Sequence, residues 1–145
     1  MNTVGIRSVL VAACFAGIVG CGENLPTPRP GTPAGPSHNG SLLPIPGDLG
    51  YVEIVNTPLS TKTTESQIGV YFYEKDAKTP VSSPPGDVKL TLELPKGNTE
   101  VFLKPDPKNP GGFQSARGDH GRRELIGKLE FTLSGKPIDL PIMTR

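Results

Sequence analysis

Apolar and polar residues alternate along most of the second half of the chain. The clearest run covers residues 88–94, where Val88, Leu90 and Leu92 alternate with polar neighbours. Such a period of two predicts strands with one buried face. Similar runs predict further strands at residues 68–73, 129–133 and 138–142, and shorter ones at residues 51–55, 100–104 and 112–116.

Turn-forming residues separate these runs. Residues 95–98, Pro-Lys-Gly-Asn, predict a hairpin between two neighbouring strands, and residues 134–137, Ser-Gly-Lys-Pro, predict another. Pro141 falls inside the last run and cannot donate a ladder hydrogen bond, which predicts an edge strand or a bulge there. The helical signal is confined to residues 122–126, one turn at most.

About seven short strands separated by turns predict an all-β fold, a single immunoglobulin-like β-sandwich in the loose sense, at residues 45–145. A small β-barrel is the alternative. This region contains neither cysteine nor tryptophan, so the hallmarks of true immunoglobulin domains are absent. The domain must therefore be stable without a disulfide.

The N-terminus has a different composition. Residues 1–20 carry a single charge, Arg7, followed by an apolar or small run from residue 9 to residue 20. A bilayer-spanning helix needs about 20 apolar residues, and this run is shorter. A cationic start, a short apolar core and a small-residue exit predict a secretory signal peptide at residues 1–20. An uncleaved membrane helix is the alternative.

Ile18-Val19-Gly20-Cys21 resembles the lipobox of bacterial lipoproteins. The resemblance implies a diacylglycerol on the Cys21 sulfur, cleavage just before it, and palmitate in a membrane anchor. Cys14 also fits the pattern, but cleavage there leaves only six residues after Arg7, and a signal core needs about 7 to 15. Gly22 stands where an Asp would favour inner-membrane retention, so we expect an envelope protein at the outer membrane, facing the periplasm.

A proline-rich stretch follows Cys21. Seven prolines lie between residues 22 and 48, which leaves no room for a helix or a paired strand. We assign residues 21–44 to a disordered or polyproline II tether with a reach on the order of 80 Å. Apolar residues at positions 42, 43, 45 and 49 indicate that ordered structure begins near residue 40.

Charge and catalytic inventory exclude several classes. Without Arg7 the chain has 14 basic and 14 acidic residues, so a broad basic face for nucleic acid is not expected. A nucleophile needs a neighbouring base, and the domain has no cysteine, no G-x-S-x-G elbow and few histidines. We expect a protein that is not an enzyme.

The candidate metal ligands are His38, His120 and Met143. Imidazole and thioether suit copper, but no H-x-H or M-x-x-M pair occurs, so a site would have to be assembled across the sandwich. The alternative is two exposed loop histidines and a methionine at a strand end. Asp106 lies in a proline-rich loop that is more typical of a turn than of a calcium site.

A second resemblance covers residues 38–142. His38-Asn39-Gly40, residues 50–55 (GYVEIV) and residues 70–73 (VYFY) are similar to motifs of small exported domains of planctomycete-type bacteria, which carry an HGG-like motif and two such strands. Phe113-Gln114-Ser115 and Gly135-Lys136 fill comparable places. The resemblance implies the fold, the exported address and His38 as the HGG-type histidine. Such domains sometimes accompany metal-efflux components.

We therefore expect a lipid-anchored, non-enzymatic envelope protein whose domain binds or scaffolds a partner protein or a small ligand. The alternative function is a periplasmic copper-handling accessory protein that uses His38 with His120 or Met143.

Overall fold

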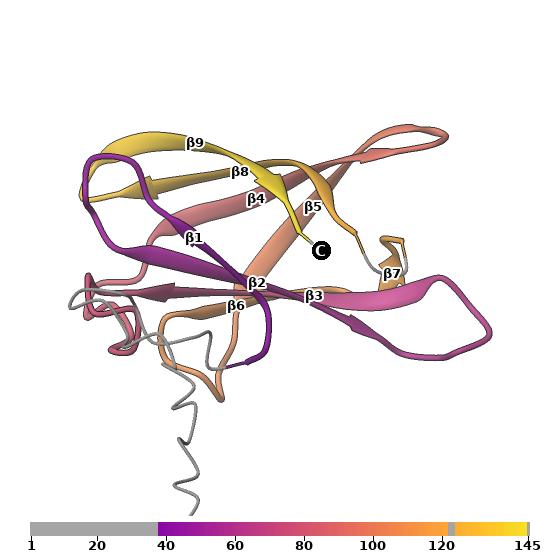
Figure 1. Ribbon diagram of the computed structural model, residues 1–145, viewed down its shortest axis with the longest axis horizontal. Helices are drawn as coiled ribbons and strands as arrows, with labels where there is room; N and C mark the ends of the chain where they lie inside the picture. The colour runs from indigo at the N-terminus through magenta and orange to yellow at the C-terminus, as the bar shows by residue number, and fades with distance from the viewer. Residues whose placement is uncertain (1–37, 122–123, 145) are drawn as a thin grey trace, which may run out of the picture. The chain divides into compact units, whose positions relative to one another are not determined.

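The computed structural model describes residues 38–121 and 124–144, and every regular element among them is a β-strand (Figure 1). No helix in this part of the chain is long and apolar enough to cross a bilayer. The predicted signal peptide, Cys21 and the tether up to residue 37 lie outside the described residues.

The strands are β1 (Ser41–Pro44), β2 (Tyr51–Pro58), β3 (Glu65–Tyr73), β4 (Gly86–Leu94), β5 (Gly97–Pro105), β6 (Gly112–Ser115), β7 (Gly118–Asp119), β8 (Ile126–Leu133) and β9 (Lys136–Met143). The all-β prediction is confirmed. The described chain has nine strands where about seven were expected, and the additional ones are the short β1 and β7. β1 lies in the stretch that the sequence assigned to the end of the tether.

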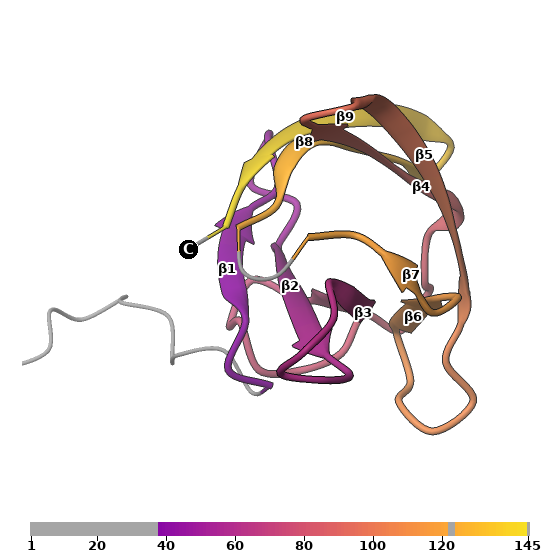
Figure 2. The same cartoon turned by 90° about the vertical axis from the view of Figure 1, so that its right-hand side faces the viewer.

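All the strands belong to one antiparallel sheet in the order β1-β2-β3-β6-β5-β4-β8-β9, with β7 paired to β3. The sheet curls over on itself, so that β1, β2, β3 and β6 face β4, β8 and β9 (Figure 2). β5 belongs to both halves, since it pairs with β4 through residue 102 and with β6 from residue 103. The fold thus has the facing layers of the expected sandwich and the continuous sheet of the barrel alternative.

The inward-facing side chains of the two halves form one hydrophobic core. The predicted alternation holds on β4, where Val88, Leu90 and Leu92 are buried. Phe72 on β3 makes edge contacts with Phe113 on β6, at 5.8 Å between ring centroids, and with Phe131 on β8, at 4.9 Å. The buried core residues all lie between residues 45 and 142. A chain that begins at residue 22 therefore contains every described element and the whole core.

The predicted hairpins are confirmed. β4 and β5 are joined across residues 95–96, and β8 and β9 across residues 134–135. Ser134 and Gly135 both have positive φ, 52° and 76°, as a type I′ turn requires. β9 is an edge strand, as Pro141 predicted. Of the expected helical turn, residues 122–123 lie outside the described residues, and Ile126 begins β8.

Gly127 provides a sharp test of this packing. It lies opposite Leu92 on β4 and Ile142 on β9, and a Cβ atom built on it would overlap the carbonyl oxygen of Thr91. We expect Gly127→Ala to lower the free energy of unfolding by about 3 kcal/mol in urea denaturation, because backbone must move to make room. Gly86→Ala is the matched control, since a Cβ there meets nothing within 4 Å. Its effect should stay within about 0.5 kcal/mol, and equal losses in both variants would contradict the register.

Candidate functional site

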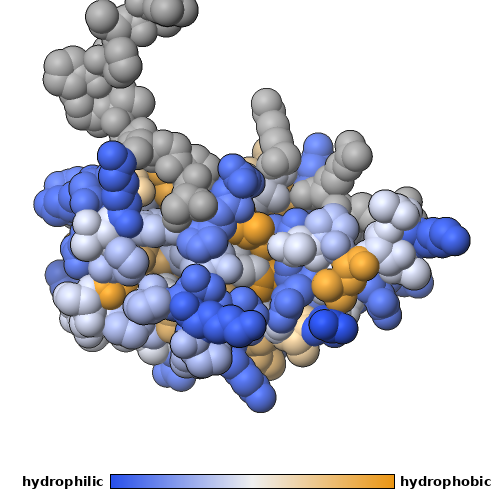
Figure 3. All heavy atoms as spheres, turned by 90° about the horizontal axis from the view of Figure 1, so that it is seen from below, coloured by the Kyte–Doolittle hydropathy of each residue, from blue (hydrophilic) through white to orange (hydrophobic). Residues whose placement is uncertain are grey.

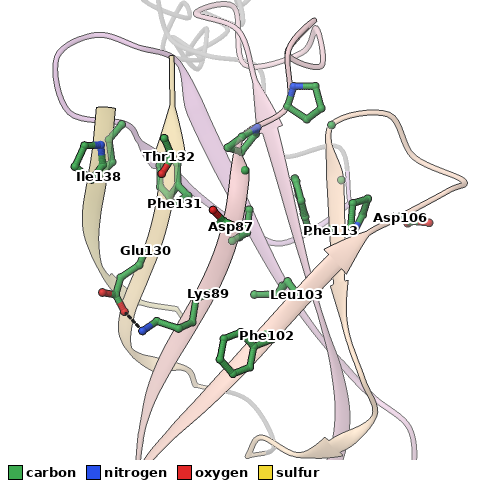
Figure 4. A pocket seen from close by; sticks show the side chains of 18 of the residues that line it. Asp87, Lys89, Phe102, Leu103, Asp106, Phe113, Glu130, Phe131, Thr132 and Ile138 are labelled. Carbon is green, nitrogen blue, oxygen red and sulfur yellow. Dashed lines mark ion pairs between the residues drawn. The ribbon is translucent and has the colours of Figure 1, made fainter. Parts of the chain in front are cut away.

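A cleft opens where β4 and β5 separate. Their ladder ends at the pair Lys89 and Phe102. Before this pair β4 continues beside β8 alone, and beyond it β5 continues beside β6 alone. The space between the diverging strands has a volume of about 750 Å³, within the usual range for ligand pockets. We call it the wedge cleft (Figure 4).

The wedge cleft is lined from both diverging strands, from the loop before β4, from the loop between β5 and β6, and from β8 and β9. Its lining residues are Pro84–Lys89, Phe102, Leu103, Pro105, Asp106, Asn109–Phe113, Glu130–Thr132 and Pro137–Asp139. The sequence analysis did not predict this cleft. Its only sequence signal is the density of prolines in the two loops that flank it.

Apolar side chains form the floor of the cleft and part of its mouth. Val88, Leu103 and Phe113 are buried core residues that also line the cleft. Phe102 lies at the lower end of the cleft in Figure 4, and 68% of its surface is exposed. A phenylalanine exposed to this extent does not contribute most of the free energy that burying its ring would provide. The cleft therefore offers apolar surface that an occupant can cover.

The underside of the molecule as drawn in Figure 1 gives a contrast. On that face apolar residues come to the surface in small separate spots among hydrophilic side chains (Figure 3). Such scattered apolar exposure is ordinary for a folded protein and does not indicate a binding surface.

The polar side chains of the cleft are mostly carboxylates. Lys89 Nζ lies 3.1 Å from Glu100 Oε1 and 3.2 Å from Glu130 Oε2. Hydrogen bonds from Lys128 and Lys89 hold the pKa of Glu130 below its usual value. Glu130 is therefore ionised at neutral pH, and it points toward Lys89 in Figure 4.

Asp106 is a second fixed charge at the cleft. Its Oδ2 accepts hydrogen bonds from the side-chain amides of Asn109, at 2.6 Å, and Gln114, at 2.7 Å, and its Oδ1 accepts one from the Lys108 N–H at 2.9 Å. These bonds, the one from Asn109 above all, lower the pKa of Asp106. The residue holds its own loop in a turn, as the sequence predicted in preference to a calcium site.

A separate polar cluster lies on the outer face of β2 and β3. Glu53 is fully buried between two apolar core residues of β2. Its Oε1 accepts the backbone N–H groups of His38 and Gly40, both at 2.8 Å, and its Oε2 accepts the hydroxyl of Tyr73 at 2.9 Å. Burial raises the pKa of Glu53, but these bonds outweigh it, so its pKa lies below the usual value. The carboxylate fixes residues 38–40 to the sheet.

The imidazole of His38 completes this cluster. Its Nδ1 lies 3.1 Å from Glu53 Oε2 and 3.0 Å from the Tyr73 hydroxyl oxygen. The Tyr73 hydroxyl gives its one proton to Glu53, so Nδ1 of His38 is assigned as the donor to both oxygens. The ring also stacks on Tyr71 at 3.8 Å between centroids. His38 thus has a structural role at the point where the chain enters the domain.

The other candidate metal ligands lie elsewhere. His120 is buried, not exposed as the alternative interpretation supposed, and its Nε2 lies 3.2 Å from the Ala116 carbonyl oxygen. Its Nδ1 has no hydrogen-bond partner among the described residues. Met143 is 65% exposed on the edge strand β9. Within the described chain no hydrogen bond, ion pair or ring contact joins any two of the three residues His38, His120 and Met143.

The two histidines lie near different parts of strand β3 and are therefore far apart. His38 stacks on Tyr71, whereas the His120 ring lies against Gly118, which pairs with Ser66. Tyr71 and Ser66 are five residues apart on β3, about 17 Å at the ordinary strand rise. Among the described residues no group of three histidine, cysteine or acidic side chains is arranged to hold a metal ion. The copper site stays a prediction.

In comparisons with protein-family models, with curated proteins and with solved structures, no match to this chain was found. The resemblances to lipoproteins and to the exported HGG-type domains therefore stay predictions that rest on the quoted motifs.

The Glu53 cluster makes a testable contribution to stability. Because the pKa of Glu53 is lower in the folded protein than its ordinary value of 4.5, its stabilisation is complete above about pH 4.5 and is lost as pH falls through the folded value. We expect Glu53→Gln to lower the free energy of unfolding at pH 7 by about 2 kcal/mol, the usual loss for hydrogen bonds to a charged group.

The same variant should also flatten the loss of stability on acidification below about pH 4.5. Urea denaturation at a series of pH values measures both effects. Tyr73→Phe is the matched control, because it removes one donor and leaves the carboxylate in place. If the free energy of unfolding fell as steeply below about pH 4.5 in Glu53→Gln as in the unaltered chain, this assignment would be contradicted.

Proposed function

We propose that the protein is a lipid-anchored, non-enzymatic protein of the cell envelope whose β domain binds a ligand in the wedge cleft. The observation that carries the binding role is the cleft itself, an opening of about 750 Å³ that exposes core side chains beside fixed carboxylates. A concave, largely apolar site with a few placed polar groups is the usual form of a binding pocket.

The anchor rests on the sequence. The lipobox-like cysteine at residue 21 and the proline-rich stretch after it would place the domain at a membrane surface on a semi-rigid spacer. The Glu53 cluster supports this arrangement, because it fixes residues 38–40 where such a spacer would join the domain. A force applied through the spacer would act on these hydrogen bonds before it acted on the hydrophobic core.

Metabolic labelling with palmitate tests the anchor. We expect the unaltered protein and Cys14→Ser to be labelled and to sediment with membranes, because the predicted acceptor is the Cys21 sulfur. Cys21→Ser should lose the label. Equal labelling of Cys21→Ser, or loss of the label in Cys14→Ser alone, would overturn the assignment of Cys21.

Binding of a neutral apolar dye tests the cleft. With a chain that begins at residue 22, we expect Nile red to bind saturably. Phe102→Ser should weaken that binding roughly tenfold, the effect of losing about 1.4 kcal/mol of apolar burial. Met143→Ser is the matched control, since Met143 is equally exposed and does not line the cleft. Equal weakening in both variants, or no saturable binding, would remove the support for the cleft.

A further inference from the structure

We propose that the wedge cleft takes an extended, basic peptide segment of a partner protein, which adds as a strand between β4 and β5. This inference rests on the proposed function and names the class of ligand. It depends on three properties of the cleft: open strand edges, an apolar floor and an excess of negative charge.

The open edges come from the topology. Gly86, Asp87 and Val88 lie before the β4–β5 ladder begins, and in this segment the only described pairing is that of Gly86 with Thr132 on β8. Leu103–Pro105 lie after the ladder ends, and they pair only with β6. The edges of these two segments that face the cleft therefore have no strand partner in the described chain.

Backbone groups at an open edge are strong hydrogen-bonding groups that need partners when water is excluded. An extended peptide supplies N–H and C=O groups at the spacing of a strand, which a compact small molecule does not. Main-chain pairing would give such a complex its affinity, and the side chains that alternate along the peptide would give it specificity.

The floor suits one face of such a peptide. Val88 and Leu103 come from the two diverging strands, and Phe113 of β6, drawn above Leu103 in Figure 4, adds to the same floor. Phe102 stands at the closed end of the wedge, where it can cover an apolar side chain. Successive residues of a strand point to opposite faces, so apolar residues at every second position would meet this floor.

The charge of the cleft determines which side chains fit on the other face of the peptide. The titratable side chains that line it are four carboxylic acids, Asp87, Asp106, Glu130 and Asp139, and one amine, Lys89. The amine is already paired with Glu100 and Glu130, and Lys128 pairs with Glu130 and Asp139, so that Asp87 and Asp106 are the cleft carboxylates without an ion pair in the described chain. Lysine or arginine between the apolar residues of the peptide would therefore meet opposite charge, which favours both encounter and register.

A second copy of this chain fits less well. The sheet has two outer edge strands. β1 has only four residues, contains Pro44 and carries no basic side chain, and β9 contains Pro137 and Pro141, which have no N–H to donate to a ladder. A separate partner with a basic, extended segment meets all the requirements without this defect.

Titration with matched peptides tests the proposal. The probe is the peptide Lys-Val-Lys-Phe-Lys-Val-Lys. One comparison peptide has glutamate in place of every lysine. Two further comparison peptides are N-methylated, one at the backbone nitrogens of the odd-numbered residues and one at those of the even-numbered residues. We expect the basic peptide to bind the chain from residue 22 and to weaken at least about fivefold between about 50 mM and about 500 mM salt. The acidic peptide should not bind, and both methylated peptides should bind about tenfold more weakly, because the N–H groups of an inserted strand point alternately toward β4 and toward β5.

Variants locate the site. Asp87→Asn should weaken the basic peptide about threefold, whereas Glu93→Gln, which removes an exposed carboxylate of β4 outside the cleft, should leave it unchanged. Amide NMR shifts should map to residues 86–88 and to residues 103 and 104. Equal binding of the acidic peptide, undiminished binding of either methylated peptide, or shifts confined to other strands would overturn the inference.

Failure of this inference differs from failure of the proposed function. If Nile red binds in the cleft but no peptide does, the cleft is a small-molecule site and the peptide inference is wrong. If neither binds, the proposed function itself fails. A concentration-dependent dimer that Phe102→Ser abolishes, without peptide binding, would show that a second copy is the occupant and would also overturn the inference.

Discussion

The change of partner along β5 is the constraint on which the rest of the structure depends. One strand pairs with β4 over its first residues and with β6 over its last, and so it joins the two facing halves of a single sheet. β4 pairs with β5 only as far as Phe102, and β6 pairs with β5 only from Leu103, so β4 and β5 separate at the point where β6 joins β5. The curl of the sheet, the shared aromatic core around Phe72 and the wedge cleft are consequences of this crossing.

Two carboxylates show how position decides the role of the same chemical group. Glu53 is completely buried, and its charge is compensated by backbone N–H groups and by Tyr73 and His38. It has no capacity left for a ligand, so it acts as a clamp on the first described residues. Glu130 at the cleft is tied to lysines in solvent-exposed ion pairs, which contribute little to stability. Carboxylates of this kind can still attract a positively charged partner.

The sequence predicted those parts of the fold that depend on local patterns. Period-two alternation located β4, β8 and β9, and the turn residues at 95–96 and 134–135 located both hairpins, because each signal is contained within a few neighbouring residues. Residues 41–44 were assigned to the tether because the prolines of residues 22–48 were expected to exclude a paired strand. That expectation is wrong for β1, which pairs with β2 and ends at Pro44. The barrel-like continuity of the sheet was not predictable, since it depends on where β5 exchanges one partner for another.

The candidate site was harder to predict for the same reason. The cleft is formed by backbone that lacks a partner, and no residue type marks such a place in a sequence. His38 was predicted as a metal ligand, a prediction that is untested, and its hydrogen-bond partner Glu53 looked like an ordinary outward position of a strand. Its burial comes from residues 38–40 folding back over it, a contact between segments 13 to 15 residues apart.

The binding role depends most directly on the edges of β4 and β5 that face the cleft. Amide hydrogen exchange, followed residue by residue in the free chain and with the basic peptide bound, tests this claim most directly. We expect the peptide to slow exchange at residues 86–88 and at residues 103 and 104, and to leave the ladder of residues 97–102 unchanged. Slowing spread evenly over the sheet, or confined to the outer edges β1 and β9, would contradict it.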